Sequence, residues 1–182
     1  MGKIHIQDFI NSLARITLSG SVVEDKNRDT CQKLFQEQAM GAIEMKEGKL
    51  TEMLIAEIFV CHIPLSLFLS KKDKINILDD YYIEIYKLLK DQYRFLNNKI
   101  ELEIFEDLLQ ERYKEYYPLV KNATDENWVK IIAKKVAEIL APNHQGLLQL
   151  ALSGTFTDLF TTIDGFVEEA SSKFDMDFNN KA

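Results

Sequence analysis

Residues 57–70 read EIFVCHIPLSLFLS, and the part from 58 to 69 contains hardly any polar side chain. A run of this kind belongs to a membrane segment, a reactive site or the centre of a core. A helix that crosses a bilayer needs about 20 mainly apolar residues, whereas this run has about a dozen and is preceded by Glu57. An extension toward the N-terminus would add Glu52, which is costly in hydrocarbon. We therefore expect a core helix that is apolar on nearly all sides, and no membrane span.

Pro64 interrupts this apolar run. Proline lacks a backbone N–H, and its ring clashes with the preceding turn of a helix. The helix therefore either kinks at Pro64 or stops near His62 and restarts with Pro64 in its first turn. Both alternatives predict a bend in the middle of the core.

Apolar residues recur at steps of three and four along the rest of the chain, which is the pattern of amphipathic helices. Seven Gly and three Pro in 182 residues leave little material for the tight turns of a β-sandwich or barrel. We predict an all-α, single-domain bundle of about seven helices. They are expected at about residues 4–18, 31–43, 50–69, 75–96, 100–117, 124–140 and 147–170.

Two of these helices are expected to form a long antiparallel hairpin over residues 75–117. Asn97 and Asn98 mark the turn between them, and so short a connection favours antiparallel neighbours. Pro118 is expected to end the second helix of the hairpin, because it cannot continue the backbone hydrogen bonding.

No linker rich in Pro, Ser or Gly divides the chain, so residues 1–182 are expected to form one domain. Any seam falls at the lysine-rich turn near 71–74, between a three-helix N-terminal part and a four-helix C-terminal bundle. The tail at 172–182 is short and acidic, and we expect it to fray. Gly154 and Gly165 lie inside the last expected helix, where each marks a kink or a close approach of another backbone.

The helical phases also predict which side chains lie in the core. The clearest candidates are Phe59, Ile63, Leu67, Leu89, Leu108, Trp128, Ile132, Leu159 and Ile163.

The overall charge disfavours nucleic acid as a partner. The 22 basic and 29 acidic residues give a formal net charge of -7 at pH 7, which repels phosphate backbones. The two cysteines have neither framework nor metal-ligand spacing, and no apolar leader precedes them. We therefore expect a cytoplasmic protein with reduced thiols.

Few residues suit catalysis or metal binding. The three histidines form no HExxH or Glu-x-x-His pattern, and neither paired CxxC nor a phosphate-binding glycine motif occurs. Cys61 and His62 are adjacent, but neighbouring helical residues point about 100° apart and cannot easily share a proton. The sequence therefore predicts no catalytic residue, no metal site and no cofactor, and a protein that acts by binding rather than as an enzyme.

The tyrosines are the most suggestive side chains. All seven lie in the two helices of the expected hairpin, and a tyrosine can bury its ring while its hydroxyl stays wet. Such residues suit the edge of a core, the rim of a pocket or a subunit interface. We take five of them as a candidate interface: Tyr82, Tyr86, Tyr113, Tyr116 and Tyr117.

Two functions are open. The first, placed slightly ahead, is a helical interaction or regulatory module that binds a protein partner or self-associates through the tyrosines. The second is a bundle that encloses an apolar or amphipathic small molecule. The candidate pocket for that molecule consists of His62, Cys61, Phe156 and Phe160. If packing is the only role of His62, the substitution His62→Leu is expected to be tolerated or mildly stabilising.

Overall fold

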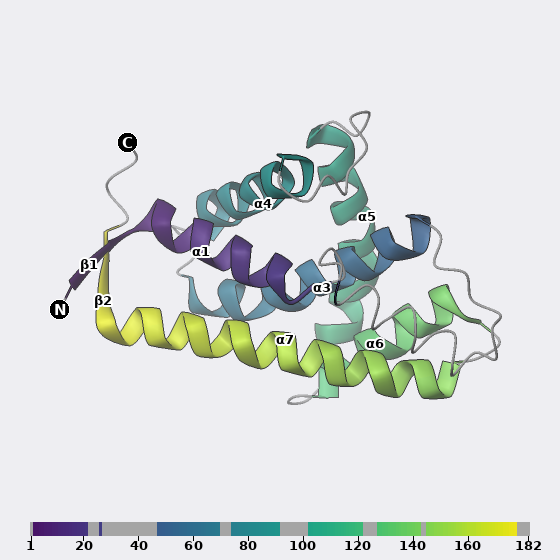
Figure 1. Ribbon diagram of the computed structural model, residues 1–182. Coiled ribbons are helices and arrows are strands. Elements are labelled where there is room, and N and C mark those ends of the chain that lie inside the picture. Colours follow the sequence, from purple (N-terminus) through teal and green to yellow (C-terminus); the bar gives the residue numbers. More distant parts are fainter. Residues whose placement is uncertain are drawn as a thin grey trace.

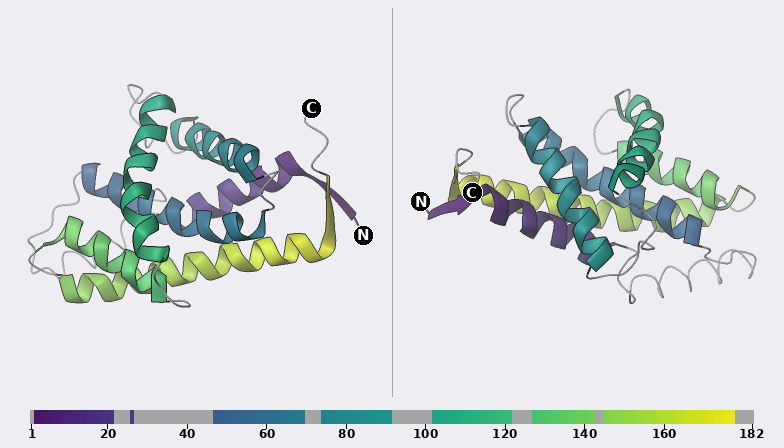
Figure 2. Two further views of the ribbon diagram at one scale, coloured as in Figure 1. Left: turned by 180° about the vertical axis from the view of Figure 1, so that it is seen from behind. Right: turned by 90° about the horizontal axis from the view of Figure 1, so that it is seen from above.

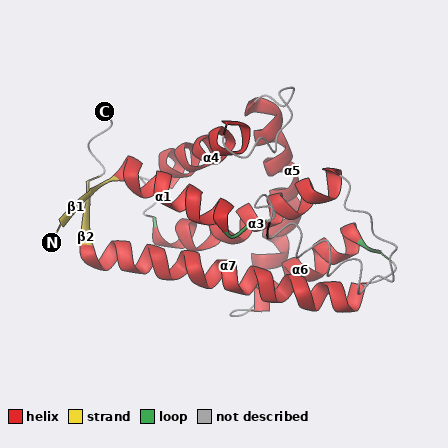
Figure 3. Ribbon diagram, viewed as in Figure 1, coloured by secondary structure: helices red, strands yellow, loops and turns green. Residues whose placement is uncertain are grey.

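The computed structural model describes residues 2–21, 26, 47–69, 74–91, 102–121, 127–142 and 145–177. Helix dominates this part of the chain, as Figure 3 shows. The all-α prediction is confirmed, with six helices among the described residues against about seven expected. The helix expected at 31–43 and nearly all of the seam at 71–74 lie outside the described residues.

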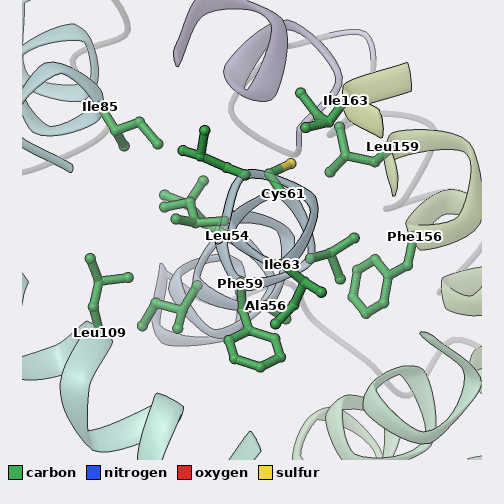
Figure 4. Packing of buried hydrophobic residues seen from close by; sticks show 14 of the residues in the cluster. Leu54, Ala56, Phe59, Cys61, Ile63, Ile85, Leu109, Phe156, Leu159 and Ile163 are labelled. Atoms are coloured by element: carbon green, nitrogen blue, oxygen red, sulfur yellow. The ribbon is translucent and has the colours of Figure 1, made fainter. Parts of the chain in front are cut away.

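Helix α3 (Glu47–Phe68) is the core helix that the apolar run predicts. Every residue from 53 to 65 is buried, and Figure 4 shows apolar side chains surrounding α3 on several sides. Neighbours on all sides explain why this helix has no polar face. The helices that contact it are α1 (Ile6–Ser19), α4 (Lys74–Asp91), α5 (Leu102–Lys121), α6 (Asn127–Leu140) and α7 (Gln145–Lys173).

One described helix is long and apolar enough to cross a membrane, and it is α3, over Lys49–Phe68. The apolar stretch is longer than the expected dozen residues because the helix continues past Glu57 and Glu52 toward its N-terminus. Within the 18-residue window that meets this test, 72% is buried inside the structure, and a core helix meets the test as readily as a membrane span. Length and composition alone are weak grounds for a membrane span.

Two prolines lie inside helices. Helix α3 continues through Pro64, so the alternative in which it stops and restarts is wrong. Helix α5 continues through Pro118 to Lys121, so the expected end at Pro118 is also wrong. A proline removes one backbone hydrogen bond, and Pro64 lies in the fully buried part of α3, where packing on all sides outweighs that loss.

Helix α7 runs along the length of the molecule, with α6 beside it (Figure 1). Helix α3 lies against α7, while α4 and α5 lie on the other side of α3. The two views in Figure 2 show α4 and α5 crossing at a steep angle, so the described helices do not form the expected antiparallel hairpin. Helix α4 ends at Asp91, and residues 92–101, which join the two helices, lie outside the described part.

Two short strands, one near each end of the chain, pair with each other. Strand β1 (Gly2–His5) pairs in parallel with β2 (Phe174–Asp177), with Gly2 opposite Phe174 and His5 opposite Asp177. The expectation that the tail frays from 172 is therefore wrong up to Asp177, because backbone hydrogen bonds to β1 hold it. Residues 178–182 lie outside the described part.

Most of the expected core residues are buried. Leu108 is only half-buried. The prediction for Leu67 is wrong, because this side chain is 79% exposed. Leu67 lies in the last turn of α3, beyond the run of buried residues. Its apolar side chain therefore does not pack in the core. Seven are buried: Phe59, Ile63, Leu89, Trp128, Ile132, Leu159 and Ile163.

The glycines of α7 do not mark a close approach of another backbone. No described atom lies within 4 Å of the position that a Cβ would take at Gly154 or Gly165, and α7 continues through both. A side chain, and not a backbone, comes close to a different glycine. A Cβ at Gly20, just after α1, would be 2.9 Å from Cδ1 of Leu159.

Candidate functional site

His62 is bonded on both sides by tyrosines from neighbouring helices. Its Nδ1 shares a hydrogen bond with the hydroxyl of Tyr82 in α4, and its Nε2 shares one with the hydroxyl of Tyr117 in α5. Only 4% of His62 is exposed. A neutral imidazole has one N–H donor and one acceptor nitrogen, so it can satisfy both hydroxyls at once. His62 thereby links α3 to α4 and α5.

Aromatic rings surround this link. The hydroxyl oxygens of Tyr82 and Tyr113 lie 3.3 Å apart. The ring of Phe59 lies edge-to-face with Tyr113, at 4.8 Å between centroids, and with Tyr117, at 5.3 Å. We call Phe59, His62, Tyr82, Tyr113 and Tyr117 the His62 cluster. It brings His62 of the candidate pocket together with three tyrosines of the candidate interface.

The phenols of this cluster stay protonated at neutral pH. Burial raises the pKa of Tyr82 and of Tyr113 well above the ordinary range of a phenol. It also raises the pKa of Tyr117, which lies nearer the surface. They therefore act as neutral hydrogen-bonding groups that hold the imidazole, and not as ionised bases.

Cys61 belongs to a different buried polar group. Figure 4 shows that Cys61 and Phe59 point to opposite sides of α3. Burial raises the pKa of the Cys61 thiol, and a hydrogen bond with Thr17 of α1 only partly offsets this. Oγ1 of Thr17 lies 2.9 Å from the hydroxyl of Tyr81. A thiol that is buried and protonated is unreactive, and Cys61 and His62 have different partners.

The four residues of the candidate pocket are not brought together. Phe156 is fully buried in the core beside α3 (Figure 4). Phe160 packs edge-to-face on Trp128 of α6, with 5.3 Å between centroids. His62 instead faces α4 and α5. The pocket was expected where a bend at Pro64, His62 and the Phe-rich last helix would enclose a small molecule, but the sequence does not reveal which faces of α3 the other helices cover.

The tyrosines do not form one exposed face. Tyr86, Tyr113 and Tyr116 are buried, and Tyr82 is half-buried. Tyr117, at 42%, is the most exposed member of the candidate interface. The others pack between helices, at the edge of the core.

An open groove of about 730 Å³ lies next to the His62 cluster. Its lining comes from the last turns of α3, the last turns of α5 and the start of α6, and Tyr117 belongs both to this lining and to the cluster. We call it the α3/α5 groove. Its lining residues are Ile63, Ser66, Leu67, Tyr117, Pro118, Val120, Lys121 and Trp128.

Sequence reasoning missed most of this groove. It assigned Leu67 and Trp128 to the core, and it took Pro118 only as the end of a helix. One signal was present, since the apolar pattern of α5 continues past the proline to Val120. The continuation of α5 past Pro118 places these residues opposite the end of α3, which a helix ending at 117 would not do.

An ion-pair network joins three helices beside the cluster. Nε of Arg112 in α5 donates to Oε2 of Glu52 in α3 at 2.7 Å, and its Nη2 donates to the other oxygen. Nη1 of Arg112 donates to Glu115 at 2.7 Å, and Nζ of Lys135 in α6 lies 3.2 Å from Glu115. Because the guanidinium and both carboxylates are paired with one another, this network holds α3, α5 and α6 together.

Among the described residues, no group of three His, Cys, Asp or Glu side chains could hold a metal ion. Comparisons of the chain with protein-family models, with curated protein sequences and with solved structures find no match. The geometry of the site therefore carries the functional argument.

Proposed function

We propose that this protein acts by binding, without catalysis, and that the α3/α5 groove takes an amphipathic small molecule. The observation that carries the proposal is the groove itself. Small-molecule sites are concave, mostly apolar and about 300 to 1,000 Å³ in volume, with a few polar groups. The groove has about 730 Å³ and an apolar lining except for Ser66, Lys121 and the polar tips of Tyr117 and Trp128.

The buried tyrosines favour this proposal over an interaction module. A tyrosine interface needs several exposed rings, and most of the nominated rings are packed inside. One observation favours the alternative of self-association. Leu67 is 79% exposed at the groove, and an exposed large apolar side chain also suits a second copy of the chain.

The chain offers a direct readout for a bound ligand. Trp128 is its one tryptophan and lines the groove, so a molecule that enters the groove changes the surroundings of the indole ring. We expect 1-decanol or sodium decanoate to shift the tryptophan emission in a saturable way. Native mass spectrometry of the same samples is expected to show one added molecule per chain.

A matched pair of variants locates the site. Leu67→Glu places a charge in the groove, whereas Leu150→Glu places one on α7 outside the lining, and both leucines are at least 70% exposed, so neither change disturbs the core. We expect Leu67→Glu to abolish 1-decanol binding and Leu150→Glu to preserve it. No binding of either probe to the unmodified chain would refute the proposal. An oligomer that Leu67→Glu dissociates, with no bound probe, would establish self-association instead.

A further inference from the structure

We propose that the molecule bound in the α3/α5 groove carries an acidic head group, a carboxylate, which Lys121 and Trp128 hold. This inference rests on the function proposed above and specifies the class of ligand: a free aliphatic carboxylic acid whose chain lies along the apolar lining.

The charge of the groove is the first observation. Lys121 is the one charged residue in the lining, and among the described residues it has no ion-pair partner. Its ammonium is a point charge on a flexible stem, so it can follow the position of a bound anion. The formal net charge of the chain is -7, so long-range electrostatics repel an anion. A preference for an anion would therefore come from the groove.

The hydrogen bonding of Trp128 is the second observation. Trp128 as a whole residue is 8% exposed, and its indole N–H makes no hydrogen bond within the described part of the chain. An indole N–H is a donor only, so it can bind an acceptor and not a cation. Since Trp128 lines the groove, a carboxylate oxygen bound there can accept this hydrogen bond.

The other polar side chains of the groove are already engaged. The hydroxyl of Ser66 donates to the carbonyl oxygen of Ile63 at 3.0 Å, and the hydroxyl of Tyr117 is bonded to His62. The groups left to bind a head group are one ammonium and one N–H, and both are donors. Such a pair favours an anionic acceptor over an ammonium, and a carboxylate over a neutral alcohol.

A series of probes that share one apolar chain tests the head group. Sodium decanoate, 1-decanol and decylamine are titrated at pH 7.5 into the full chain, below the concentrations at which they self-associate, and Trp128 emission is followed. We expect decanoate to bind about two- to fivefold more tightly than 1-decanol, which is what an exposed ion pair contributes. Decylamine is expected to bind most weakly, since its ammonium faces Lys121.

Two lysine variants on the same helix separate the local effect from net charge. Lys121→Gln is expected to bring decanoate to the affinity of 1-decanol. Lys114→Gln makes the same change in net charge, outside the groove lining, and is expected to leave the preference intact. If the unmodified chain binds decanoate and 1-decanol equally, or if both variants lose the preference for decanoate to the same extent, the proposal of an acidic head group is refuted. The proposed function is unaffected by either result. If no probe binds, the proposed function itself fails.

Discussion

At the scale of single residues, the most informative side chain is His62. The sequence allows two interpretations of a lone imidazole in an apolar run, a packed core residue or a polar group in a pocket. In the structure His62 is buried, as the first interpretation expects. Both of its nitrogens are nevertheless hydrogen-bonded to tyrosine hydroxyls from other helices. Its chemical role is to satisfy those hydroxyls and to fix the ring of Tyr117 as one wall of the groove.

The substitution His62→Leu is therefore expected to destabilise the protein, contrary to the expectation for a residue that only packs. Leucine fills the space but leaves the hydroxyls of Tyr82 and Tyr117 without this partner. Tyr117 is partly exposed and can turn to water, and Tyr82 keeps its contact with Tyr113. We expect a loss of about 1 kcal/mol in the free energy of unfolding by urea denaturation. A more stable variant would restore the packing interpretation.

Two adjacent tyrosines of α5 give a sharper test. Tyr117→Phe removes the partner of a buried imidazole nitrogen and is expected to cost about 1 to 2 kcal/mol. Tyr116→Phe removes a buried hydroxyl that has no hydrogen-bond partner among the described residues, so it is expected to be neutral or stabilising. Each change deletes one oxygen, and urea denaturation compares them. The same cost for both variants would contradict the hydrogen bond between Tyr117 and His62.

At the scale of elements, the periodicity of apolar residues predicts the helices better than their ends. Pro64 and Pro118 illustrate the difficulty, because a proline breaks an isolated helix but is tolerated where neighbouring helices bury the turn around it. From the sequence one can predict that each proline removes a backbone hydrogen bond of the helix. The packing of neighbouring helices that compensates this loss cannot be predicted from the sequence. The strands β1 and β2 were missed for another reason. Four residues are too few to show alternation, and each strand's partner lies at the other end of the described chain.

The glycines of α7 lead to a prediction at this scale. Gly154 and Gly165 lie on exposed positions in the interior of a helix, and a Cβ at either would meet no described atom within 4 Å. Alanine restricts the unfolded chain and suits a helix, so Gly154→Ala and Gly165→Ala are each expected to add about 0.5 to 1 kcal/mol of stability. Thermal unfolding measures the effect. Gly20→Ala is the control, since its Cβ would meet Leu159 at 2.9 Å and should give no gain.

At the scale of the whole molecule, the site depends on how α3, α4 and α5 cross. An antiparallel hairpin of α4 and α5 would have kept the tyrosines on one face. Because α4 and α5 cross instead (Figure 2), their tyrosines converge on His62 of α3, and the end of α5 lies beside the end of α3. The sequence predicts helices and apolar faces, but crossing angles follow from the shapes of all contacting side chains together. The residue types of the site were therefore foreseeable, and their grouping was not.

The ion pairs that hold α3, α5 and α6 together predict how this arrangement responds to pH. A hydrogen bond from Lys135, and secondly the nearby charges of Lys135 and Arg112, lower the pKa of Glu115 from its ordinary 4.5. An acid with a lower pKa in the folded state stabilises the fold fully above its unfolded pKa, and this stabilisation is lost as the pH falls through the folded pKa. Lys135 and Glu115 are 34% and 38% exposed, so screening limits the contribution to about 0.5 kcal/mol.

Glu115→Gln is accordingly expected to lower the free energy of unfolding by about 0.5 kcal/mol at pH 7, and to cost less as the pH falls below 4.5 and the Glu115 carboxyl of the unmodified protein becomes protonated. Urea denaturation at pH 7 and pH 3 measures the two differences. Glu111→Gln, an exposed change on the same helix outside the ion-pair network, is expected to have a smaller effect at pH 7. A cost of Glu115→Gln that is as large at pH 3 as at pH 7 would mean that the side chain acts through packing, and that charge does not tie α5 to α6.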